Sequence, residues 1–232
     1  MGTSTGTESG GSAFYDELAA ELVAMRAALP NDEASFFNRP MSERELVEYL
    51  CFQAYYELRA SQFIGGWLAD TPERDALVLL AQQVEDEAQH HEYFMRALER
   101  RGIDSLDGWR PEPEWEAWID GWYPSGADTL ERVAAHNLAG EIGACQAFEE
   151  ISPRLPADVQ RTLERVVPDE RFHLKLGRTL IDRYCRTEGD RERVRGRVLH
   201  TFELEQAGRA AYNRRMVRLG LSDPGDPVPG LG

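Results

Sequence analysis

Two segments of the chain share the pattern Asp-Glu-x-x-His; one contains Glu87 and His90, and the other contains Glu170 and His173. Three residues are close to one turn of an α-helix, so the Glu and the His of each segment would leave a helix on the same side and could bind one metal ion together. A single pair of this kind arises often by chance on charged helices. The two pairs therefore need further ligands before they indicate a metal site.

A further glutamate precedes each pair at almost the same distance. Glu57 lies 30 residues before Glu87, and Glu141 lies 29 residues before Glu170, with a proline-containing turn about midway in both cases. At 1.5 Å per residue, about 14 residues place both members of each pair roughly 20 Å from their turn, at one height on two antiparallel helices. The sequence thus predicts six metal ligands at one level: Glu57, Glu87, His90, Glu141, Glu170 and His173.

These ligands require long helices, and the sequence supplies the signals for them. Apolar residues at helical spacing, capping patterns at Ser42 and Asp128, and turn-forming prolines and glycines delimit the segments. Thr71 is expected to cap the third helix, with Pro72 at its first position. The predicted helices span residues 13–29, 42–69, 71–101, 128–151, 157–184 and 190–219.

Residues 103–127 interrupt the helical pattern with prolines and glycines, yet they hold four of the five tryptophans: Trp109, Trp115, Trp118 and Trp122. A flexible linker would be polar, whereas indole rings need an apolar surface to cover. We therefore expect a packed crossover along one side or end of a helical bundle. No segment shows the signals of a β-strand, so the sequence predicts an all-α protein.

The composition suits one globular domain. With 232 residues, 42% of them hydrophobic, the chain can bury a sizeable core. We expect a tail at 1–12, a single helical domain at 13–219 and a Gly/Pro-rich tail at 220–232. The ten Arg and six Asp or Glu of residues 182–218 are expected to form a solvated helix face rather than a binding patch.

Charge and cysteine content limit the classes of binding partner and the cellular compartment that we expect for this chain. The net charge of −15 argues against nucleic acid or an acidic membrane surface as a partner, and no apolar run is long enough to span a membrane. Three widely spaced cysteines form neither a disulfide framework nor a CxxC pair. The start of the chain lacks the features of a signal peptide, so a cytoplasmic location is expected.

The ligand pattern resembles the ferritin-like di-iron carboxylate superfamily, whose bundles supply one Glu from each of two helices and a Glu-x-x-His pair from each of the other two. The resemblance covers roughly residues 42–184, and the stretch 164–174 is similar to the last ligand helix of the aldehyde-deformylating oxygenases. It implies a ferritin-like four-helix bundle with extra N- and C-terminal helices and one long crossover. It also implies two iron ions, with Fe/Mn or Mn as alternatives, and O2 as co-substrate.

The resemblance further implies a non-haem di-iron oxidase or oxygenase that acts on a small organic substrate. Such an enzyme would take electrons from an external donor, a ferredoxin or a flavin reductase, and could form a homodimer. The alternative is a ferroxidase or peroxidase of the ferritin or rubrerythrin kind, although no CxxC pair is present for a rubredoxin-type centre. Radical storage is disfavoured, because Phe94 occupies the position where that branch usually keeps a tyrosine.

Roles within the ligand set stay partly open. As in relatives, Asp86 and Asp169 would accept the second N–H of a ligand histidine and fix its tautomer. Glu57 and Glu170, or their counterparts across the site, would bind terminally while the other two carboxylates bridge. His91 could replace His90, although the spacing in the second motif favours His90.

The remaining candidates have equally ordinary explanations. Small residues near Glu141 could leave a pocket beside the metals, with Ala144, Cys145 and Phe94 as wall candidates, or could serve close helix packing. Pro168 predicts a kink in the fifth helix or a restart of that helix. His136 and His200 have no partner at ligand spacing, so we interpret both as ordinary residues.

Overall fold

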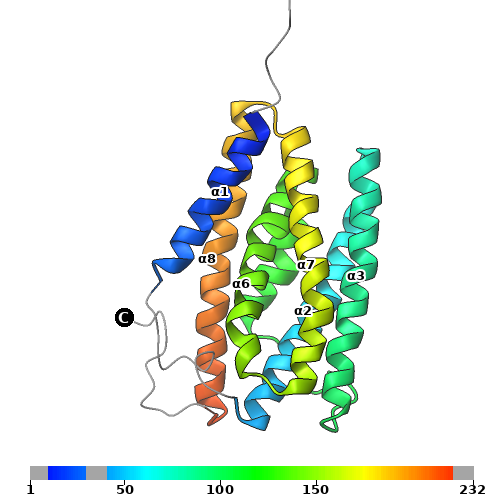
Figure 1. The fold of residues 1–232 in the computed structure, drawn as a ribbon, viewed down its shortest axis with the longest axis vertical. Helices are drawn as coiled ribbons and strands as arrows, with labels where there is room; N and C mark the ends of the chain where they lie inside the picture. Colours follow the sequence, from blue (N-terminus) through cyan, green and yellow to red (C-terminus); the bar gives the residue numbers. More distant parts are fainter. Residues whose placement is uncertain (1–9, 30–40, 222–232) are drawn as a thin grey trace, which may run out of the picture.

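A computed structural model describes residues 10–29 and 41–221 of the chain. Their secondary structure is entirely helical, as predicted, with no strand among them. The long helices lie side by side along the long axis of the molecule (Figure 1). In chain order the elements are α1 (Gly10–Ala27), α2 (Glu43–Leu68), α3 (Arg74–Glu99), α4 (Pro113–Trp115), η2 (Glu116–Trp122), η3 (Tyr123–Ser125), α5 (Thr129–Val133), η4 (Ala134–Gly140), α6 (Glu141–Ile151), η5 (Ser152–Arg154), α7 (Ala157–Tyr184) and α8 (Glu188–Arg218).

The hairpin of α2 and α3 begins at a capping box. The Ser42 hydroxyl accepts from the amide of Glu45, whose carboxylate accepts from the amide of Ser42. The predicted N-cap at Thr71 is wrong, because α3 begins at Arg74 and the Thr71 hydroxyl instead donates to the last turn of α2, at the carbonyl of Trp67. That bond satisfies a carbonyl that the helix end would otherwise leave without a partner.

The second hairpin pairs α7 with a composite helix made of α5, η4 and α6. The predicted helix 128–151 is thus present, but its middle is a seven-residue π-helical segment, η4. The Asp128 side chain caps its start by accepting from the amide of Glu131. Helix α7 continues unbroken through Pro168, so the helix does not restart there. A π segment changes which residues share a face, and η4 ends directly before Glu141.

The crossover packs as predicted, although much of it is helical rather than irregular. Trp115 and Trp118 are buried, and the Trp115 indole donates to the carbonyl of Gly208 on α8. Trp122 donates to the Thr201 hydroxyl, also on α8. The crossover therefore fills the space between the hairpins and α8.

Helices α1 and α8 flank the two hairpins (Figure 1). The arginines of α8 mostly pair with acidic side chains of neighbouring elements, as Arg193 does with Asp128 and Arg215 with Glu48. This supports the expected solvated, ion-paired face.

The predicted tails fall mainly outside the described residues. Residues 10–12 belong to α1, so that helix starts earlier than position 13. In the described part of the chain, no helix is long and apolar enough to cross a membrane.

Candidate metal centre

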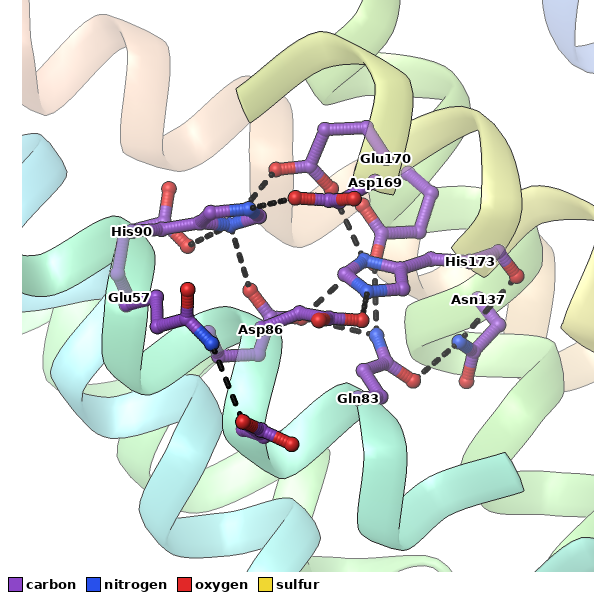
Figure 2. A network of polar contacts seen from close by, with 12 residues as sticks. Glu57, Gln83, Asp86, His90, Asn137, Asp169, Glu170 and His173 are labelled. Atoms are coloured by element: carbon purple, nitrogen blue, oxygen red, sulfur yellow. Dashed lines mark hydrogen bonds and ion pairs between the residues drawn. The ribbon is translucent and has the colours of Figure 1, made fainter. Parts of the chain in front are cut away.

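The six predicted ligands meet in the middle of the bundle. They come from α2 (Glu57), α3 (Glu87, His90), the first residue of α6 (Glu141) and α7 (Glu170, His173). None exposes more than 2% of its surface. The two imidazole rings lie across the cluster from each other, with centroids 6.0 Å apart (Figure 2).

At one end of the cluster, His90 directs Nδ1 at three carboxylates. The atom lies 3.4 Å from Glu87 Oε2 and 3.4 Å from Glu170 Oε1. It lies 3.6 Å from Glu57 Oε2. One N–H cannot donate to three acceptors, whereas a cation between these atoms would contact all of them.

The other end repeats this arrangement around His173. Its Nδ1 lies 3.5 Å from Glu87 Oε1 and 3.2 Å from Glu170 Oε2. The third carboxylate is Glu141, whose Oε1 lies 3.3 Å away. Potential ligand atoms lie within 4.8 Å of one another in two groups: Glu57, Glu87, His90 and Glu170 form one, and Glu87, Glu141 and His173 form the other, so Glu87 belongs to both.

The two ends share two carboxylates. Glu87 and Glu170 each offer one oxygen toward His90 and the other toward His173. Glu57 faces only the first end and Glu141 only the second. If two ions were bound, Glu87 and Glu170 would therefore lie between them, while Glu57 and Glu141 would each contact one.

Four carboxylates buried together need compensating positive charge. Across residues 10–29 and 41–221, no Arg or Lys forms an ion pair with any of the four. Glu57 Oε2 and His90 Nδ1 are buried without a hydrogen-bond partner. Two divalent cations would balance the charge, and ligand atoms bound to one ion at about 2.0–2.2 Å are roughly 3–4 Å apart, as here. The residues fit a pair of metal ions.

Burial and mutual contacts also set the proton affinity of the cluster. Burial raises the pKa of Glu57 and of Glu141 well above the usual range of a carboxyl group. Burial acts to lower the pKa of the histidines, but neighbouring carboxylates outweigh it, and contacts with Glu57 and Glu87 raise the pKa of His90 to about 12. The pKa of His173 is raised likewise, most strongly by the charge of Glu87. Protons and metal ions would therefore compete for the same atoms.

Asp86 and Asp169 lie where the sequence suggested, with a crossed arrangement. His173 Nε2 is 3.3 Å from Asp86 Oδ2 on α3, and His90 Nε2 is 3.3 Å from Asp169 Oδ2 on α7. Each aspartate thus contacts the histidine of the opposite motif. An acceptor at Nε2 holds the proton there and leaves Nδ1 free to bind a cation.

Gln83 and Asn137 form a buried amide pair that the sequence did not indicate. Gln83 Nε2 donates to Glu87 Oε1 (2.9 Å) and Glu141 Oε1 (3.0 Å). Its carbonyl accepts from Asn137 Nδ2 at 2.7 Å. Figure 2 shows both amides at the His173 end of the cluster. The amide pair therefore orients the carboxylates of Glu87 and Glu141. The one sequence feature that could have identified Gln83 as a neighbour of the site is its position one turn before Glu87 on α3.

His136, which the sequence suggested to be an ordinary residue without a ligand partner, contacts one carboxylate of the cluster. Its ring is fully buried, and Nδ1 lies 3.4 Å from Glu141 Oε1. An α-helix turns residues five apart away from each other, but His136 lies in η4, where the wider turn brings positions i and i+5 together. Burial lowers the pKa of His136 to about 4, so the ring is neutral. The ring also stacks on Tyr56.

The other histidines behave as the sequence suggested. His91 Nδ1 lies 2.7 Å from the carbonyl of Ala54, outside the cluster, so His90 is the better ligand candidate. His200 is on the surface and pairs with Glu203.

A cavity of about 100 Å³ adjoins the cluster. Three ligand carboxylates, Glu57, Glu141 and Glu170, form part of its wall. Most of the remaining wall is apolar, with seven aromatic side chains: Tyr49, Phe52, Tyr56, Trp115, Trp118, Phe148 and Tyr212.

Of the three residues that the sequence suggested for the wall of a pocket, one lines this cavity. Ala144 lines the cavity, whereas Cys145 and Phe94 do not. Phe94 is fully buried in a core cluster with Leu98 and Leu163. Burial raises the pKa of the Cys145 thiol to about 12, which leaves it protonated and a poor nucleophile.

No protein-family model matches the chain, and no curated protein matches it significantly. The geometry of the cluster and its cavity is therefore the basis for assigning a function.

Proposed function

We propose that this chain is a ferritin-like di-iron carboxylate protein, and that it acts as an oxidase or oxygenase on a small organic substrate. The observation that carries the proposal is the pair of shared carboxylates. Glu87 and Glu170 each direct one oxygen to either end of a buried cluster whose carboxylates pair with no Arg or Lys of the described residues. Carboxylates that bridge in this way hold two ions close together.

The donor set favours iron or manganese over softer metals. Four carboxylates and two imidazoles are hard and borderline donors, and no cysteine belongs to either ligand group. Two ferrous ions bound there would supply electrons to reduce O2, and an external donor such as a ferredoxin or flavin reductase would restore them.

The apolar cavity favours a reaction with an organic molecule over iron storage. A route for hydrated Fe²⁺ would be lined by acidic and polar groups, whereas this wall is mainly aromatic rings and small residues. An apolar substrate would displace water from the cavity and lie directly against Glu57, Glu141 and Glu170.

The surrounding residues have defined tasks in this proposal. Asp86 and Asp169 hold the protons of the two histidines at Nε2. Gln83 fixes the carboxylates of Glu87 and Glu141 by donating to both. The aromatic wall excludes water, which would protect reactive species from side reactions.

Reconstitution with Fe²⁺ under anaerobic conditions tests the proposal. We expect two ions per chain, and O2 consumption that depends on a small apolar compound and an external reductant. The variant His173→Gln should lose metal, whereas His200→Gln, a surface control, should retain it. Binding of hundreds of iron atoms with mineral growth would instead indicate storage, and a chain that binds no stoichiometric metal would refute the proposal.

A further inference from the structure

A second hollow, of about 220 Å³, lies on the surface between α3 and α7, outside the metal cluster. Four arginines line it: Arg96 of α3, Arg100 at the C-cap of α3, and Arg161 and Arg165 of α7. On both helices the two arginines are four residues apart, so each pair lies on one helix face. Because α3 and α7 pack side by side, the four guanidinium groups surround one space.

The cations of this hollow are poorly neutralised by the protein. Asp158 is the acidic residue of the wall, and it already accepts from Arg101 at 2.8 Å and from Arg100 at 3.3 Å. In the described part of the chain, no carboxylate forms an ion pair with Arg96, Arg161 or Arg165. Arg165 instead lies over the ring of Tyr93.

This lack of partners contrasts with most arginines of α8. The chain has 41 acidic residues and only 26 Lys or Arg, so an arginine finds an acidic neighbour easily. On α8, arginines that are exposed as well pair with acids from other elements, as Arg193 does with Asp128 and Arg218 with Glu112. Unpaired guanidinium groups gathered in one hollow repel one another unless an anion joins them.

We propose that this hollow binds a polyphosphate group, either as free diphosphate or as part of a nucleoside diphosphate. Guanidinium groups present paired N–H donors that match phosphate oxygens, and several of them together select multiply charged oxyanions. A phosphate monoester carries about two negative charges near neutral pH, and a diphosphate carries about one more. That charge balances the three unpaired arginines, which a single carboxylate would not.

The remaining wall suits the same ligand. The Thr162 side chain lines the hollow and adds a hydroxyl group. Tyr93 supplies a flat aromatic surface beside Arg165, on which a ring attached to the phosphates could stack. The site does not depend on the proposed oxygenase activity, because none of its residues is a candidate metal ligand.

Titration calorimetry of the purified protein with inorganic phosphate, diphosphate and ADP tests the proposal, with metal content measured before and after each titration. We expect saturable binding of diphosphate at one site per chain, weaker binding of phosphate, and weakening with added salt. ADP binding more tightly than diphosphate would identify the nucleotide as the source of the group. Equal affinity would identify diphosphate itself.

Single variants locate the site. Arg161→Gln and Arg165→Gln should each weaken diphosphate binding by about tenfold, because each removes a charge-assisted contact. Arg186→Gln is the matched control: that exposed side chain has no ion pair among the described residues, lies just beyond the far end of α7, and should leave the affinity unchanged. These exposed residues contribute little to folding. No saturable binding of any of the three anions, an equal effect of the control, or heat explained by loss of metal would overturn the proposal.

Discussion

Replacing Glu57 by Gln separates the two ends of the proposed metal centre. Glu57 faces only His90, and burial raises the pKa of its carboxyl well above the usual range, which favours the neutral form. Gln has nearly the same shape as a neutral carboxyl group, so the metal-free variant should unfold within about 1 kcal/mol of the wild type. In the metal-loaded variant, the ion at the His90 end would lack one charged ligand. Removing a residue that only hydrogen-bonds to a metal ligand weakens metal binding about 10–100-fold. Because Glu57 would itself be a ligand, we expect its loss to weaken binding of that ion by at least about 100-fold.

Metal analysis after equilibrium dialysis gives the readout. Wild-type protein should hold two ions, Glu57→Gln should hold one, and Glu87→Gln should hold none, because Glu87 contacts both ends. Glu92→Gln, an exposed change on α3, is the control and should hold two. Two tightly bound ions in Glu57→Gln, or the same loss in Glu57→Gln and Glu87→Gln, would refute the division into terminal and bridging carboxylates.

Three further changes test the supporting structure. Asp86→Asn should weaken metal binding about 10–100-fold in a competition titration, because it replaces the charged acceptor at His173 Nε2 by a neutral amide; unchanged affinity would contradict its positioning role. Gly177→Ala should lower the free energy of unfolding by about 1–3 kcal/mol in urea denaturation, since its Cβ would lie 2.9 Å from the carbonyl oxygen of Asn137, whereas Gly196→Ala, with open space around it, should stabilise by up to about 1 kcal/mol. Hydrogen bonds from Arg101 lower the pKa of Asp158 to about 2, so its ion pair stabilises the fold above pH 4 and the contribution is lost as the pH falls toward 2. Asp158→Asn should cost about 1 kcal/mol at pH 7, and the difference from wild type should vanish only below the folded-state pKa of about 2.

The sequence was sufficient to group the six candidate ligands because their arrangement follows from regular helix geometry. Glu-x-x-His pairs share a helix face, and equal distances from two turns bring Glu57 and Glu141 to the level of those pairs. Helix ends with strong local signals, such as Ser42, were also predictable. The capping side chain and its target lie within one turn of each other.

Features that depend on tertiary contacts or irregular helix geometry were not predictable. His136 meets Glu141 only because η4 is a π segment, and no residue pattern distinguishes such a segment from an α-helix. Gln83 resembles any polar helix residue until the bundle buries it against Glu87 and Glu141. Thr71 and Pro72 form a good N-terminal pattern, but the carbonyl of Trp67 competes for the Thr71 hydroxyl.

Anomalous diffraction at the Fe and Mn absorption edges from crystals of metal-loaded protein tests the central claim most directly. We predict two anomalous peaks about 3.5–4 Å apart, one beside Nδ1 of His90 and one beside Nδ1 of His173, with Glu87 and Glu170 between them. A single peak, or no peak among these side chains after loading with Fe²⁺ or Mn²⁺, would contradict the account.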